Sequence, residues 1–121
     1  MNVVALCGHL SSQPVVRELQ SGSVVMGLEL TTRVDEAAIS VPLAWFDPPA
    51  DFELAAGDEI MALGTVRRRF FRAGGVTQSR TEVVVSLLAR SDDKRAVAKI
   101  RKRLGVLMGA ERAEGLRSSC G

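Results

Sequence analysis

Residues 57–88 read GDEIMALGTVRRRFFRAGGVTQSRTEVVVSLL, and this stretch decides how the rest of the chain can fold. An apolar run at residues 60–63 leads into an arginine-aromatic segment at residues 67–71, and a second β-branched run follows at residues 83–85. Paired glycines between two such runs are a strong signal for a β-hairpin. We therefore predict one long hairpin that turns at Gly74 and Gly75.

The middle of this hairpin carries a pattern with chemical meaning. Side chains of a strand alternate between its two faces, so Arg67, Arg69 and Phe71 project together, and Arg68 and Phe70 project from the reverse side. Guanidinium groups can meet phosphates while a flat ring stacks on an unpaired base, which is how single-stranded nucleic acid is bound. The alternative is a core phenylalanine beside a solvated basic edge, and these residues alone leave both open.

Three more strands are predicted before the hairpin, at residues 2–10, 24–32 and 39–46, with residues 15–19 continuing the first strand after a kink. Gly8 interrupts the first strand, as a tight bend requires. Residues 50–56 have the composition of a short helix, capped by Gly57 and anchored by Phe52. Five strands with a helix between the third and fourth are the signature of a mainly β, five-stranded OB-fold barrel. Phe46 and Phe70 are expected to point into its core.

Residues 92–108 change to a helical period, with an apolar stripe at Val97, Ile100, Leu104 and Leu107. Its polar flank is basic, and three roles stay open: docking on the barrel or a sister protomer, tracking phosphate along a wrapped strand, or binding a partner or an anionic membrane. The predicted organisation is a barrel at residues 1–90, a basic amphipathic helix at 91–108 and a disordered tail at 109–121.

Charge and composition exclude several classes of function. Residues 1–90 carry eight basic and ten acidic side chains, a net of −2, whereas residues 91–121 carry eight and four, a net of +4. Nucleic-acid affinity must therefore come from local patches.

The two cysteines offer neither a disulfide framework nor a metal spacing, and we expect no cofactor. Carboxylates at catalytic spacing and phosphate loops are lacking, so we do not expect an enzyme. Without a signal peptide or an apolar span, we expect a cytoplasmic, nucleoid-associated protein.

The spacing of several residues resembles the bacterial single-stranded DNA-binding protein (SSB) family over roughly residues 2–90. The residues that carry the resemblance are Asn2, Val4, Leu6, Gly8, Leu10, Gln13, Pro14, Arg17, Gly22, Leu28, Leu30, Trp45, Gly57, Asp58, Gly64, Val66, Arg69, Phe71, Gly75, Glu82 and Val83. The resemblance implies an OB-fold, non-catalytic binding of single-stranded DNA in replication, repair or recombination, and assembly into a tetramer or dimer.

Binding residues are transferred only where the motif matches. Trp45 and Phe71 occupy positions where the family places stacking aromatics, and Arg67 and Arg69 occupy positions of backbone contacts. Residues 33–37 carry no aromatic, and Ile39 stands where some members have tryptophan. Stacking contributes about 1–3 kcal/mol per base, so we expect weaker DNA binding than in a typical member.

From the residues themselves we add Arg72 to the phosphate contacts, and Arg33 and Arg80 as extensions of the path. The exposed edge of the first strand predicts oligomerisation. Val3, Ala5 and Cys7 would face that contact.

The family's acidic C-terminal peptide is not present, so recruitment of repair enzymes through it is not expected. One alternative function is a protein-interaction adaptor with weak nucleic-acid affinity, similar to primosomal replication proteins. Another is RNA binding, because the same stacking groove would accept it.

Overall fold

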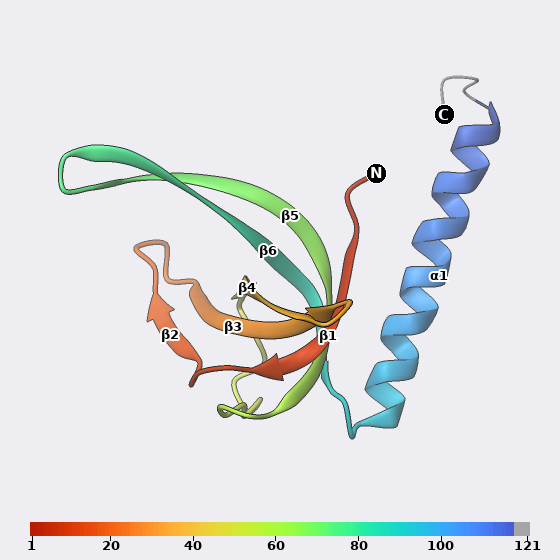
Figure 1. Cartoon of the computed structure of the whole chain (residues 1–121), viewed down its shortest axis with the longest axis horizontal. Helices are drawn as coiled ribbons and strands as arrows, with labels where there is room; N and C mark the ends of the chain where they lie inside the picture. Colours follow the sequence, from red (N-terminus) through yellow and green to blue (C-terminus); the bar gives the residue numbers. More distant parts are fainter. Residues whose placement is uncertain (118–121) are drawn as a thin grey trace.

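A computed structural model describes residues 1–117 as a mainly β structure with one long helix (Figure 1). The strands and the helix are β1 (Val4–Leu10), β2 (Val15–Glu18), β3 (Val24–Val34), β4 (Ala37–Phe46), β5 (Glu59–Ala73), β6 (Val76–Arg90) and α1 (Lys94–Arg117). Cys120 and the other predicted tail residues from 118 onward lie outside the described part.

Five strands close into a barrel in the order β1-β5-β6-β4-β3, and β3 returns to β1. The β4–β6 pairing is parallel and short, and the other pairings are antiparallel. β2 adds to the edge of β3 beside the end of β1, so it continues the path of β1 after the kink, as predicted. The barrel encloses an apolar core. Its buried members are Leu10, Met26, Leu28, Leu30, Leu43, Trp45, Leu54, Ile60, Ala62, Val83, Val85 and Leu88.

The long hairpin is confirmed, with its turn at the predicted glycines. Gly74 and Gly75 have φ values of 60° and 78°. Positive φ at both central residues matches the right-handed twist of the two strands and is readily adopted by glycine. β5 and β6 pair from Ile60 and Arg90 outward to Ala73 and Val76, with one irregularity beside Gly64. The outer half of this hairpin arches away from the barrel (Figure 1).

The predicted helix at residues 50–56 is wrong. The segment forms turns at residues 50–51 and 56–57 with irregular chain between them, and hydrogen bonds run from Phe52 N to Pro49 O and from Asp58 N to Ala55 O. Leu54 is buried and Phe52 packs against the same core. Residues two apart do not share a face of a helix, so a helix here would not direct both side chains to this core. A helix of about two turns would also gain little against its nucleation cost.

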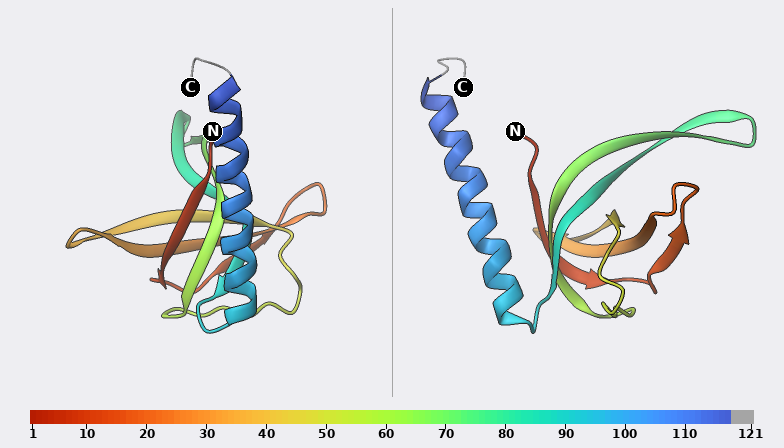
Figure 2. Two further views of the ribbon diagram at one scale, coloured as in Figure 1. Left: turned by 90° about the vertical axis from the view of Figure 1, so that its right-hand side faces the viewer. Right: turned by 180° about the vertical axis from the view of Figure 1, so that it is seen from behind.

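α1 docks its apolar stripe on the outside of the barrel. Ile100 is buried with Met61, Leu63 and Ala89, and Val97, Leu104 and Leu107 pack around them. Asp93 begins the helix, because its Oδ1 accepts a hydrogen bond from Ala96 N at 3.1 Å. Figure 2 shows α1 standing along one side of the barrel. The helix continues to Arg117, beyond the end that the sequence predicted at residue 108.

Replacing Gly8 by alanine should destabilise the fold. β1 begins to pair with β3 as well as β5 next to this residue, and a Cβ at Gly8 would collide with the carbonyl oxygen of Thr31. The backbone must shift to make room, and we expect a loss of about 1–3 kcal/mol in the free energy of unfolding, measured by urea denaturation.

The control for this prediction is Gly27→Ala, also within a strand. The nearest atom to its new Cβ is Val15 O at 3.7 Å, so the free energy of unfolding should be nearly unchanged. Equal stability of the two variants would contradict the inference that the Thr31 backbone lies too close to Gly8 for a Cβ.

Candidate nucleic-acid interface

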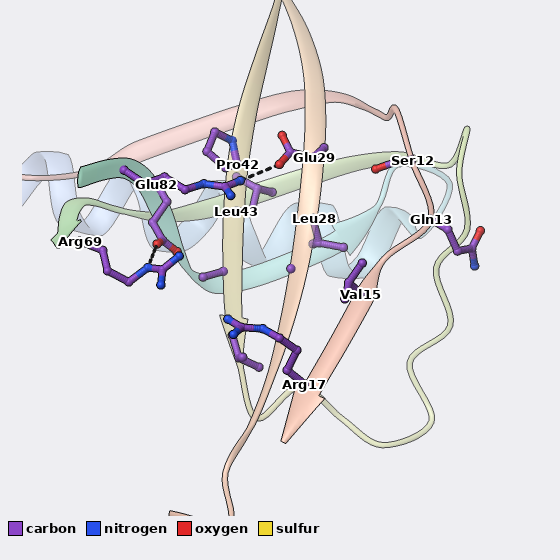
Figure 3. Close-up of a pocket in the computed structure, with 14 residues that line it drawn as sticks. Ser12, Gln13, Val15, Arg17, Leu28, Glu29, Pro42, Leu43, Arg69 and Glu82 are labelled. Carbon is purple, nitrogen blue, oxygen red and sulfur yellow. Dashed lines mark hydrogen bonds and ion pairs between the residues drawn. The ribbon is translucent and has the colours of Figure 1, made fainter. Parts of the chain in front are cut away.

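A groove crosses the outer face of β3 and β4 and is flanked by β2 and the β5–β6 hairpin (Figure 3). We call it the β3–β4 groove. Two adjoining hollows make up this groove, and they share Arg17, Val25, Ala44, Arg69 and Glu82. Its floor is made of small or apolar residues that alternate with the core residues of the same strands. Charged side chains stand around that floor, so the groove offers a flat surface within reach of several cations.

Two arginines of the hairpin share one buried carboxylate. Glu82 is 6% exposed, and its Oε1 accepts a hydrogen bond from Arg69 Nε at 2.8 Å. Arg67 approaches the other oxygen at 3.7 Å. The side chains of Arg67 and Arg69 keep about two fifths of their surface, at 41% and 38% exposed. The carboxylate therefore orients both groups and leaves one net positive charge at the groove.

Two further arginines reach the groove from other strands. Arg80 of β6 forms an ion pair with Glu29 of β3, with 2.7 Å between Nη2 and Oε1. Arg17 of β2 is exposed and forms no ion pair or hydrogen bond within the described part of the chain. Around the groove, four guanidinium groups thus face two carboxylates. Sequence reasoning did not select Arg17 as a contact, although the motif contained it.

Two rings lie beside these cations. The guanidinium of Arg69 stacks over Phe71 at 5.2 Å, and that of Arg67 stacks over Phe46 at 5.1 Å. Phe46 was predicted to be core, but it is half-buried and lines the groove. The signal was present in the sequence: residue 46 must face away from the side that Trp45 shares with Leu43.

Trp45 was predicted to lie open for stacking, and the structure corrects this. Its ring is 8% exposed within the barrel core. It packs edge-on against Phe52, with 5.1 Å between ring centroids and 82° between planes. A ring in this position has no free face for a base, so Trp45 does not belong to the interface. The cause is closure of the barrel over the Leu43 side of β4.

Two of the predicted arginines lie elsewhere. Arg33 donates to Glu36 O at 3.1 Å, within its own hairpin, and lines a hollow beside Cys7 and not the groove. Arg72 donates to Gly75 O at 2.8 Å and braces the turn. By strand alternation it projects from the face opposite to Arg69. Phe70 projects from that face too and is 66% exposed, so the expectation that it enters the core is wrong.

The three residues predicted to form the oligomer contact differ in their exposure. Ala5 and Cys7 are exposed, and β1 pairs with β5 on one side while it meets β3 only at its end, through His9 and Leu10. Val3 is half-buried against the cluster that α1 covers. Val3 is therefore occupied within its own chain, whereas Ala5 and Cys7 remain accessible.

Among the side chains that the structure describes, no three from His, Cys, Asp or Glu gather as a metal site would require. No described helix combines the length and apolarity needed to cross a membrane. No protein-family model matches the sequence, and no curated protein matches it. The β3–β4 groove is therefore the feature of the described residues that points to a function.

Fluorescence of the single tryptophan should report a buried ring. Because Trp45 is sealed in the core, we expect its emission to be blue-shifted and little quenched by iodide in the folded protein. Unfolding in guanidinium chloride, with matched ionic strength, is the control and should restore quenching. Strong quenching in the folded state would contradict the burial of this ring.

Proposed function

We propose that this chain binds single-stranded DNA, without catalysis and with little sequence preference, through the β3–β4 groove. The observation that carries the proposal is the gathering of four arginines, from β2, β5 and β6, around a groove that holds only two carboxylates. The barrel is compatible with an OB-fold, whose ligands bind on the corresponding sheet face between the flanking loops. The SSB resemblance of residues 2–90 supports the same function.

Electrostatics favours a polyanion in this groove. Arg17 has no partner within the described residues, and Arg67 and Arg69 share a single carboxylate. Phosphates can approach such partly exposed guanidinium groups and form charge-assisted hydrogen bonds. The buried Glu82 holds two of the groups in place, so less side-chain entropy is lost on binding.

Stacking in the proposed complex relies on Phe71 and Phe46. Both rings already carry a guanidinium on one face, and a base can occupy the other side only where the ring is open. With Trp45 in the core, fewer platforms remain than the resemblance implies. We therefore propose affinity below that of a typical family member and a function in replication, repair or recombination.

Phe71→Ala tests the stacking contact, and Phe70→Ala is its matched control. The two phenylalanines are neighbours on β5 but project from opposite faces. Binding of a labelled oligothymidylate, followed by fluorescence anisotropy, should weaken by about 1–3 kcal/mol in Phe71→Ala. The control should bind like the parent protein. Equal losses of affinity in both variants would contradict a specific contact between DNA and the face of the hairpin that borders the groove.

A protein-interaction adaptor is the second candidate, and the burial of Trp45 favours it. It predicts no anisotropy change with DNA or RNA oligonucleotides at low salt, whereas DNA binding predicts affinity that falls as salt rises. Tighter binding of RNA than of DNA in the same assay would instead support RNA as the ligand. Absence of binding to both would refute the proposed function.

The free edge of β1 supports assembly into a dimer or tetramer, because an unpaired edge accepts a strand from another copy. Ala5 and Cys7 would lie at this contact. Light scattering at micromolar concentration should give at least twice the 13.0 kDa chain mass. A mass equal to one chain would overturn this part of the proposal.

A further inference from the structure

The first half of α1 carries six basic side chains and no acidic one. Lys94, Arg95, Lys99, Arg101, Lys102 and Arg103 are all exposed. None of them forms an ion pair with another described side chain; Asp92 is held by Arg90 at 3.5 Å, and Asp93 caps the helix. The apolar stripe around Ile100 is packed on the barrel, and these charges lie on the exposed surface of the first half of the helix.

Their spacing makes the charges repel one another. Arg95 and Lys99 are four residues apart, and so are Lys99 and Arg103. Like charges at this spacing destabilise a helix by a few tenths of a kcal/mol per pair. The docked stripe around Ile100 offsets this cost. A bound polyanion would relieve the repulsion.

The position of two of these cations connects them with the groove. Lys99 and Arg103 line a hollow between α1 and β5, together with Gly64 and Thr65. Thr65 is exposed and lies two residues before Arg67, on the same face of β5. Two residues of strand span about 7 Å. One face of β5 therefore leads from the paired arginines of the groove to the basic flank of the helix.

We propose that α1 extends the DNA path, with Lys99 and Arg103 contacting phosphates of a strand that leaves the β3–β4 groove across Thr65. This inference rests on the proposed function and adds a second, sequence-independent contact to it. The occupant is a nucleic-acid backbone because the surface is cationic and continuous with cations that face the groove. An anionic membrane fits less well, since an interfacial helix needs its apolar face free and that of α1 is docked.

The test compares Lys99→Gln/Arg103→Gln with Lys94→Gln/Arg101→Gln. Both double variants remove two charges from the same helix, but Lys94 and Arg101 line a different hollow, on the other flank. Each protein is titrated with oligothymidylates of about 6 and about 30 nucleotides, the first within and the second beyond the roughly 4–16 nucleotides that one OB-fold contacts. The measurements are anisotropy at several salt concentrations and a thermal melt of each protein.

We expect the first variant to bind the short oligonucleotide normally and the long one less tightly. Its slope of log affinity against log salt should fall by about 1.4, at about 0.7 per lost phosphate contact. The control variant should keep both affinities, and neither variant should melt below the parent protein.

Equal weakening in both variants, or no effect on the long oligonucleotide, would overturn the inference while leaving groove binding intact. Binding of the helix to anionic vesicles, lost in the first variant while long-oligonucleotide affinity is kept, would also overturn it. Failure of the parent protein to bind either oligonucleotide would instead refute the proposed function.

Discussion

The continuous pairing of β5 with β6 is the constraint on which the rest of the structure depends. Each strand has fifteen residues, longer than closure of a small barrel requires. The first part of β5 pairs with β1 and closes the core, while its outer face receives α1. The second part leaves the barrel and carries the arginines. A single strand therefore sets the position of the core, the helix and the groove.

The cluster of Arg67, Arg69 and Glu82 shows how this constraint places charge. Glu82 stands opposite Arg67 in the β5–β6 ladder and diagonally to Arg69, so the register alone brings the three together. Burying a carboxylate is costly unless charged donors satisfy it. Here two guanidinium groups supply the donors and retain surface of their own. The same contact thus stabilises the hairpin and holds cations at the edge of the β3–β4 groove.

Charge is distributed unevenly over the molecule, and the fold concentrates basic side chains on two surfaces. The barrel portion of the chain is slightly acidic, but four of its eight arginines gather at one groove, and the helix adds a second basic surface on another side of the barrel. A net charge near neutrality therefore conceals two local cationic surfaces. Local potentials of this kind, and not the net charge, govern how a polyanion approaches.

The sequence by itself determined the strands, the glycine turn and the helix stripe. These features depend on alternation, on φ at Gly74 and Gly75, and on residue spacing within a few positions. Alternation also placed Phe46 and Trp45 on opposite faces of the strand, although it did not specify which of the two faces would become the core. The chain segment at residues 50–56 escaped prediction because packing of Phe52 and Leu54 on the core overrode its helical composition.

Only the tertiary structure decided which side of β4 faces the core and which arginines come together at the β3–β4 groove. Arg17, Arg69 and Arg80 are separated by 11 to 63 positions along the chain, and closure of the barrel brings them to one groove. Arg33 and Arg72 have the same chemistry, yet their strands carry them elsewhere. Local sequence dictates which face a side chain takes, but long-range strand pairing dictates what that face meets.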